Sequence, residues 1–136
     1  MDIFIFASEQ WLLLSTFLVL LYLFIFTERT KGGKPISSAE LVSAMNAETA
    51  ILIDVRPSNE FQAGHIHGAL DIPHTKIASR ISELEKYRER TIVLVDQMGQ
   101  HAGSAGKILS KDGYNVRRLS GGMNDWQHQN MPVVKN

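Results

Sequence analysis

The fold of this chain is decided by Thr91-Ile-Val-Leu-Val-Asp-Gln-Met-Gly-Gln-His-Ala-Gly-Ser-Ala-Gly-Lys-Ile-Leu109. Residues 91–95 are mostly β-branched and predict a strand that is buried on both faces. A short loop over residues 96–101 follows, and small and apolar residues then recur at helical spacing. A loop between a strand and a helix N-terminus points several backbone N–H groups into one concavity, where the helix dipole adds partial positive charge. The stretch therefore predicts an anion-binding cradle whose first residue is Asp96.

Asp96 stands where a nucleophile would have a lowered pKa. A cysteine in this position would be a reactive thiolate, but the chain contains no cysteine, so thiolate and persulfide chemistry are excluded. A carboxylate can accept hydrogen bonds from the N–H groups itself, as an N-cap aspartate does, and we expect Asp96 to fill its own anion site. The alternative is that Asp96 is a nucleophile or general base. That chemistry normally needs a metal or a second carboxylate, and the loop supplies neither.

The composition of the whole chain narrows the possible partners. Its 136 residues suit one compact domain with a short appendage. Lys plus Arg and Asp plus Glu balance at 14 each, so nothing indicates nucleic acid as a partner. The absence of cysteine rules out a disulfide scaffold and fits a reducing compartment.

Much of the apolar content lies near the N-terminus. Residues 11–26 contain nothing more polar than Ser15, Thr16 and Tyr22. As a helix this run is about 24 Å long, and residues 3–7 lengthen it towards the roughly 30 Å of a bilayer core. A buried core helix would have a polar face, which this run lacks. The run therefore predicts a membrane-spanning helix.

We assign residues 1–28 to an N-terminal transmembrane anchor, with a cleavable signal peptide as the competing interpretation. The first ten residues carry no Lys or Arg, and no small-x-small cleavage site follows the run, which argues against a signal peptide. Basic side chains follow the run at Arg29, Lys31 and Lys34, and none precedes it. The positive-inside rule then places the N-terminus outside and the domain in the cytoplasm, at the inner (cytoplasmic) membrane.

Residues 29–35, with a Gly-Gly pair, are expected to form a flexible linker, and residues 36–136 a domain. Strands and helices alternate along this domain. We expect strands over 51–55, 91–95 and 114–119, a short strand before residue 73, and helices over 39–46, 57–64, 76–90 and up to 112, with a last short helix after 122. This order predicts an α/β fold with a parallel sheet covered on both faces and ligand sites at the carboxyl ends of its strands.

Two segments of the domain resemble a known family. Leu52-Ile-Asp-Val-Arg-Pro-Ser-Asn-Glu-Phe-Gln-Ala-Gly-His-Ile-His-Gly-Ala-Leu70 is similar to the first signature of the rhodanese (sulfurtransferase) domain. Gly121-Gly-Met-Asn-Asp-Trp126, followed by Pro132-Val133, is similar to its C-terminal signature. The resemblance covers about residues 35–134. The signature positions, which we expect to be structural, are Asp54, Arg56, Glu60, Gly64, His65, Gly68, Gly121, Gly122 and Trp126.

The resemblance implies a five-stranded parallel sheet with helices on both faces, here preceded by one transmembrane helix. In active members, the loop after the fourth strand begins with a cysteine that carries sulfur as a persulfide and commonly ends with an arginine. Here the cysteine position is Asp96 and the arginine position is His101. We therefore interpret the loop as a degenerate active site consisting of Asp96, Gln97, Met98, Gly99, Gln100 and His101.

These two replacements change the charge of the loop as well as its nucleophile. A pair of unit charges 4 Å apart interacts by roughly 4 kcal/mol at an effective dielectric near 20. We therefore expect the concavity to disfavour thiosulfate, phosphate and arsenate. The related phosphatase and arsenate reductase activities also need a cysteine, so they fail for the same reason.

The remaining signature residues have structural interpretations. We expect Arg56 to pair with Glu60 one helical turn on, and Asp54 to hold the loop that follows it. Gly64 is expected to end a helix, and both Gly64 and Gly68 to supply special backbone conformations. His65 is expected to bond to the backbone, and Trp126 to lie in the core.

The other histidines show no metal-ligand spacing, and we expect neither a metal nor a cofactor. A metal site that combines Asp96 and His101 with a third histidine is the alternative, the candidates being His67, His74 and His128.

The sequence therefore predicts a membrane-tethered, catalytically inactive rhodanese-like domain that acts as a binding or regulatory module for a protein partner. One alternative is a noncanonical enzyme that uses Asp96 and His101. Another is a scaffold whose anchor helix itself binds other membrane proteins. Exposed apolar surroundings of the loop would favour the binding module, and a deep pocket that converges on Asp96 and His101 would favour the enzyme.

Overall fold

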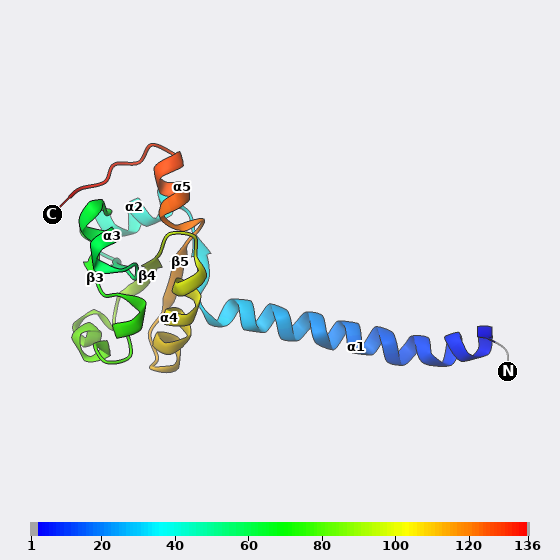
Figure 1. The fold of residues 1–136 in the computed structure, drawn as a ribbon. Helices are drawn as coiled ribbons and strands as arrows, with labels where there is room; N and C mark the ends of the chain where they lie inside the picture. The colour runs from blue at the N-terminus through cyan, green and yellow to red at the C-terminus, as the bar shows by residue number, and fades with distance from the viewer. Residues whose placement is uncertain (1–2, 136) are drawn as a thin grey trace. The chain divides into compact units, whose positions relative to one another are not determined.

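The structure is a computed structural model that describes residues 3–135, apart from the side chains of residues 6–7 and 28–31. The chain divides into two units, residues 1–30 and residues 31–136 (Figure 1). The side chains of Arg29 and Lys31, which enter the orientation argument, lie outside the described part.

The described residues of the first unit all lie in one continuous helix, α1 (Ile3–Lys31). Its segment Ile3–Thr27 is long and apolar enough to cross a membrane, with a mean hydropathy of 2.0. The hydroxyl groups of Ser15 and Thr16 both donate to the carbonyl oxygen of Leu12, at 3.0 and 2.8 Å, so they need no water. The structure thus contains the single apolar N-terminal helix that the sequence predicts.

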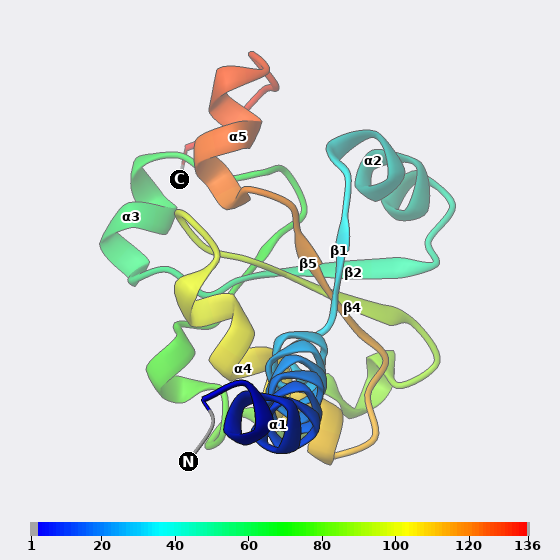
Figure 2. The same cartoon turned by 90° about the vertical axis from the view of Figure 1, so that its right-hand side faces the viewer.

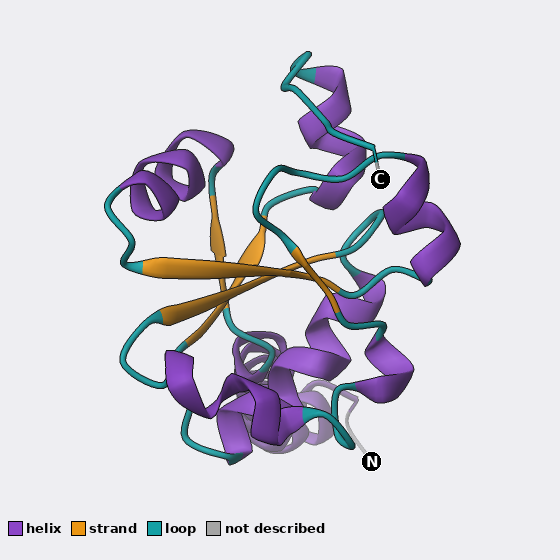
Figure 3. Ribbon diagram, turned by 90° about the vertical axis from the view of Figure 1, so that its left-hand side faces the viewer, coloured by secondary structure: helices purple, strands orange, loops and turns teal. Residues whose placement is uncertain are grey.

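The second unit is built on a five-stranded sheet (Figures 2 and 3). All neighbouring strands are parallel, and their spatial order is β1-β5-β4-β2-β3. Each consists of few residues: β1 (Lys34–Ile36), β2 (Ala50–Asp54), β3 (Leu70–Asp71), β4 (Thr91–Val95) and β5 (Val116–Leu119). The five-stranded parallel sheet is therefore confirmed.

Helices cover both faces of the sheet, as expected of strands that are buried on both sides. They are α2 (Ser38–Asn46), α3 (Ser58–Ala63), α4 (Gln100–Lys111) and α5 (Gly122–His128). On one face Leu41 of α2 and Met123 and Trp126 of α5 pack against β1, β2, β4 and β5. On the other face Leu109 of α4 packs with Ile77, Leu84 and Tyr114. These two clusters form the core.

The expected helix over residues 76–90 is wrong in type. The structure has two 3₁₀ helices instead, η1 (His74–Lys76) and η2 (Ile81–Tyr87). Arg80 interrupts the segment, because its backbone leaves the helical region while its side chain pairs with Glu83 at 2.7 Å and reaches the carbonyl oxygen of Asp71. The apolar residues of the segment still face the core.

The expected flexible linker over residues 29–35 is also wrong. Helix α1 continues to Lys31, residues 34–36 form β1, and Gly32 and Gly33 between them are buried. A Cβ atom on Gly106 of α4 would lie only 2.1 Å from the carbonyl oxygen of Gly32. Gly33 has a φ of +101° and its carbonyl oxygen accepts from Arg118 at 3.0 Å. The entry into the domain is thus a close-packed contact between the backbones of Gly32 and α4.

Candidate functional site

The loop between β4 and α4 closes around the side chain of Asp96. This carboxylate is 3 % exposed and accepts hydrogen bonds from the backbone N–H groups of Gly99, His101 (2.6 Å) and Ala102 (3.1 Å). Two of these donors belong to the first turn of α4, where the helix dipole favours negative charge. The anion position of the loop is therefore occupied by the protein's own carboxylate.

The segment that begins with Gly121 and Gly122 holds this loop from the other side. The backbone N–H groups of Met123 and Asn124 donate to the carbonyl oxygens of Asp96 and Gln97, at 2.8 and 3.0 Å. Gly122 permits this approach, because its φ is +60° and a Cβ atom there would lie 2.4 Å from the Asp96 carbonyl oxygen. The C-terminal signature thus positions the loop, a role that could not be predicted from its sequence alone.

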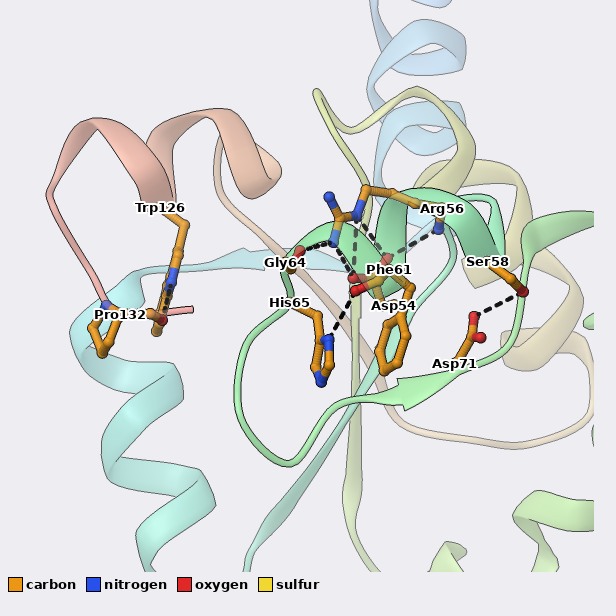
Figure 4. A network of polar contacts seen from close by, with 9 residues as sticks. All are labelled: Asp54, Arg56, Ser58, Phe61, Gly64, His65, Asp71, Trp126 and Pro132. Atoms are coloured by element: carbon orange, nitrogen blue, oxygen red, sulfur yellow. Dashed lines mark hydrogen bonds and ion pairs between the residues drawn. The ribbon is translucent and has the colours of Figure 1, made fainter. Parts of the chain in front are cut away.

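Arg56 forms a buried ion pair with Asp54 rather than with Glu60 (Figure 4). Its Nη2 atom lies 2.8 Å from Asp54 Oδ2 and 2.8 Å from the carbonyl oxygen of Gly64, and its backbone N–H donates to Asp54 Oδ1. Asp54 is fully buried at the end of β2, so its charge needs this partner more than exposed Glu60 does. The expected Arg56–Glu60 pair is therefore wrong, while Asp54 does hold the following turn as expected.

His65 and Trp126 fasten the C-terminal segment to the domain. The Nδ1 atom of His65 lies 2.8 Å from the carbonyl oxygen of Phe61, and its ring stacks on the Phe61 ring. The backbones of His65 and Val134 exchange two hydrogen bonds of 2.9 and 2.8 Å. The Nε1–H group of buried Trp126 donates to the carbonyl oxygen of Pro132 (Figure 4). Contacts of both residues thus hold the C-terminal segment against the domain.

The two signature glycines of the first segment differ in conformation. Gly68 has a φ of +89°, in the left-handed region that favours glycine. Gly64 ends α3 but has an extended backbone with φ 162°, which any residue adopts. The expected special conformation is thus present at Gly68 and absent at Gly64.

A cavity of about 240 Å³ opens beside the loop. It is lined by residues from three segments, among them Arg56, Glu60, His74, Asp96, Met98 and His101. The rings of His74 and His101 stack with their centroids 3.9 Å apart and their planes 4° apart. His74 joins the site through the fold alone, because nothing in its sequence spacing connects it with His101.

The histidines and carboxylates of residues 3–135 form no group of three or more that could hold a metal ion. His101 stacks on His74, the oxygens of Asp96 are engaged by N–H groups, and His128 bonds to the carbonyl oxygen of Asn124. The residues considered for a metal site are therefore not arranged as ligands.

A second cavity, of about 720 Å³, lies beside β3 and η2, away from the loop. It is lined by charged and apolar side chains, among them Asp71, Arg80, Glu83 and Tyr87. The adjacent Arg80 guanidinium lowers the pKa of Glu83 through its hydrogen bond to that carboxylate. This cavity is larger than the one beside the loop, but its charged side chains are less available to a ligand, because Arg80 and Glu83 already form an ion pair with each other.

Comparisons with known proteins agree with this geometry. The model of the family "Rhodanese-like domain" matches residues 37–129. YibN of Escherichia coli K12 is 30% identical over 130 residues, which cover 94% of this chain and 89% of YibN. The thiosulfate sulfurtransferase GlpE of Shewanella oneidensis is 30% identical over 98 residues, which cover 71% of this chain and 95% of GlpE.

Solved structures give the same result. The crystal structure of a rhodanese-related protein from Thermoplasma volcanium aligns with a TM-score of 0.69 and 25% identity, over 76% of this chain and all of that chain. This chain therefore belongs to the rhodanese-like domain family, as a member whose loop between β4 and α4 begins with an aspartate.

Proposed function

We propose that this chain is a membrane-anchored rhodanese-like protein that binds a protein partner through the loop 96–101 and catalyses no sulfur transfer. The observation that carries this proposal is the Asp96 carboxylate, which takes three N–H donors of the loop. An incoming anionic donor such as thiosulfate would find those N–H groups engaged and a fixed negative charge among them.

The resemblance to sulfurtransferases does not extend to the reacting atom. GlpE is named a thiosulfate sulfurtransferase, and a persulfide mechanism needs a thiol sulfur. This chain has no cysteine anywhere in its 136 residues. What it keeps is the scaffold: the sheet, the buried Asp54–Arg56 pair and the loop itself. A retained scaffold without its nucleophile supports a binding role.

The surface of the loop also supports binding to another protein. Met98 at its tip is 70% exposed, and Gln97 and Gln100 beside it are exposed as well. A flexible thioether on a protruding loop is a common contact group in protein interfaces. The loop lies at the carboxyl ends of the strands, where α/β domains bind their ligands.

The rival proposal is an enzyme that uses Asp96 and His101, and the cavity that both line speaks for it. Against it, the Asp96 oxygens are engaged and nearly inaccessible to a substrate. A general base must reach the proton it removes within about 3 Å. We therefore prefer the binding module. The further alternative, that α1 itself binds other membrane proteins, rests on its apolar surface alone.

Photo-crosslinking tests the proposal in native membranes. A photo-reactive amino acid at Gln97, in the loop, is expected to give a discrete covalent adduct with another protein. The matched control places the same group at Glu89, which is also exposed but precedes β4 and so lies at the opposite end of that strand from the loop. Equal adducts at both positions, or none at Gln97, would contradict a partner at the loop.

A second test concerns membrane topology. We expect the domain to face the cytoplasm, because Arg29, Lys31 and Lys34 follow the apolar helix while no basic residue precedes it. Protease added to intact spheroplasts is expected to leave the domain undigested, and lysis is expected to expose it. Digestion before lysis would show the opposite orientation, and recovery of the protein in the soluble fraction would show that α1 is not an anchor.

A further inference from the structure

The cavity beside the loop is lined by two carboxylates, and neither forms an ion pair with a basic side chain in the described part of the chain. One belongs to Asp96, whose carboxylate is held by N–H groups at the base of the cavity. The other belongs to Glu60, which lies exposed on the rim and has no ion-pair partner in the described part of the chain. Arg56, the basic residue of this lining, is neutralised by Asp54 at 2.8 Å. The electrostatic potential of the cavity therefore favours a cation.

The shape of the cavity limits the size and form of that cation. A volume of about 240 Å³ is smaller than the roughly 300–1,000 Å³ of pockets for drug-sized ligands, so it suits a single long side chain. The parallel rings of His74 and His101 line the cavity, and His101 is exposed to solvent. A flat, delocalised cation can stack on such a ring while it donates hydrogen bonds to a carboxylate.

We infer that this cavity binds an arginine side chain of a protein partner, with the guanidinium stacked on the His101 ring and paired with Glu60. The inference rests on the proposed binding function and names the chemistry that the site recognises. Arginine is preferred over lysine because its guanidinium is planar and presents a fork of donors to a carboxylate. The loop geometry alone indicates a site for an anion, whereas the charges of the side chains around it favour a cation.

A peptide titration of the full-length protein in a nonionic detergent tests this inference. The probe is acetyl-Gly-Arg-Gly-amide, and the reporters are the five histidines, labelled with ¹³C at Cε1. The signals of His74 and His101 are expected to shift with saturation, while that of His128 stays in place. Binding of a single side chain is expected to be weak, with a dissociation constant on the order of 1 mM.

Two comparison peptides and one anion separate the competing occupants. The corresponding lysine peptide is expected to bind more weakly, and the neutral glutamine peptide and sodium sulfate are expected to cause no saturable shift. If the lysine peptide binds as tightly as the arginine peptide, the site recognises any cation, and the proposed stacking of a guanidinium on His101 is wrong. Saturable binding of sulfate would overturn the charge argument itself.

Variants of the rim test the contacts individually. Glu60→Gln is expected to lower the affinity for the arginine peptide about threefold, because it removes one exposed ion pair. The control Glu89→Gln removes an exposed carboxylate far from the cavity and is expected to change nothing. His101→Ala keeps the backbone N–H group that holds Asp96 and is expected to abolish the shift at His74. Unchanged affinity in Glu60→Gln would overturn the proposed pairing.

The titration and the crosslinking experiment fail in different ways. If the Gln97 adduct forms but the arginine peptide does not bind, the partner site stands and its proposed chemistry is wrong. If the peptide binds and no adduct forms, the cavity recognises arginine but the proposed partner at the loop is wrong.

Discussion

Replacing Asp96 with cysteine is expected to create a thiol that iodoacetamide alkylates about tenfold faster near neutral pH than an unperturbed cysteine. The three N–H groups that now hold the carboxylate would surround the sulfur and stabilise its thiolate. Because the chain has no other cysteine, the new thiol is the only one to react. Ser43→Cys, on an exposed part of α2, is the control.

The rates of sulfur transfer from thiosulfate are expected to rank the variants differently from the rates of thiol alkylation. The unmodified protein is expected to produce no thiocyanate above a blank, and Asp96→Cys alone very little, because His101 lacks the fixed charge and the forked N–H donors with which an arginine would bind the anionic donor. Adding His101→Arg is expected to raise the rate at least about tenfold, since a charge-assisted hydrogen bond contributes roughly 1.5–3 kcal/mol.

The control for this series is His101→Arg alone, which supplies the cation without a nucleophile and is expected to stay inactive. An Asp96→Cys protein as active as the double variant would show that the charge of the loop is not the obstacle. A slowly alkylated thiol at position 96 would show that the loop N–H groups do not stabilise an anion.

The second large effect is expected at the contact between α4 and the entry segment. Gly106→Ala would place a Cβ atom 2.1 Å from the carbonyl oxygen of Gly32 and 2.8 Å from its carbonyl carbon. Both atoms are backbone, so no side chain can move aside, and overpacking is expected to cost about 2–3 kcal/mol of unfolding free energy. Amide hydrogen exchange is expected to rise most in β1, because the contact between Gly32 and Gly106 holds this strand in position.

Gly103→Ala in the same helix is the matched control. A Cβ atom there has the Arg118 Nη1 atom at 3.8 Å as its nearest neighbour, an ordinary contact. The substitution is expected to be neutral or to stabilise by up to about 1 kcal/mol, because alanine favours the helix over glycine. Urea unfolding, followed by the fluorescence of Trp126 in a Trp11→Phe background, measures both. Equal midpoints for the two variants would contradict the close contact.

The sequence predicts the parts of this fold that depend on local pattern. The buried strand over residues 91–95 is visible because β-branched and apolar residues run without interruption. The role of the Asp96 carboxylate follows from the same stretch, because a strand, a short loop and a helix leave N–H groups for an anion. Both conclusions need only neighbours in the chain.

The features that the sequence does not reveal depend on distant segments. Strand β1 is three residues long and contains Pro35, which fits an edge strand but carries no alternating pattern. Arg56 has a carboxylate at helical spacing in Glu60, yet it pairs with Asp54 because burial makes that charge the more costly to leave alone. The stack of His74 on His101 exists only once η1 and α4 pack together.

The close-packed entry at Gly32 also determines how far the domain can reach. Only residues 28–31 separate the apolar segment Ile3–Thr27 from Gly32, and four fully extended residues span at most about 14 Å. If α1 crosses a membrane as proposed, this short connection holds the domain beside a partner in the same membrane at an effective concentration in the millimolar range. A cavity that holds a single side chain with millimolar affinity would then be occupied about half of the time without any tighter contact.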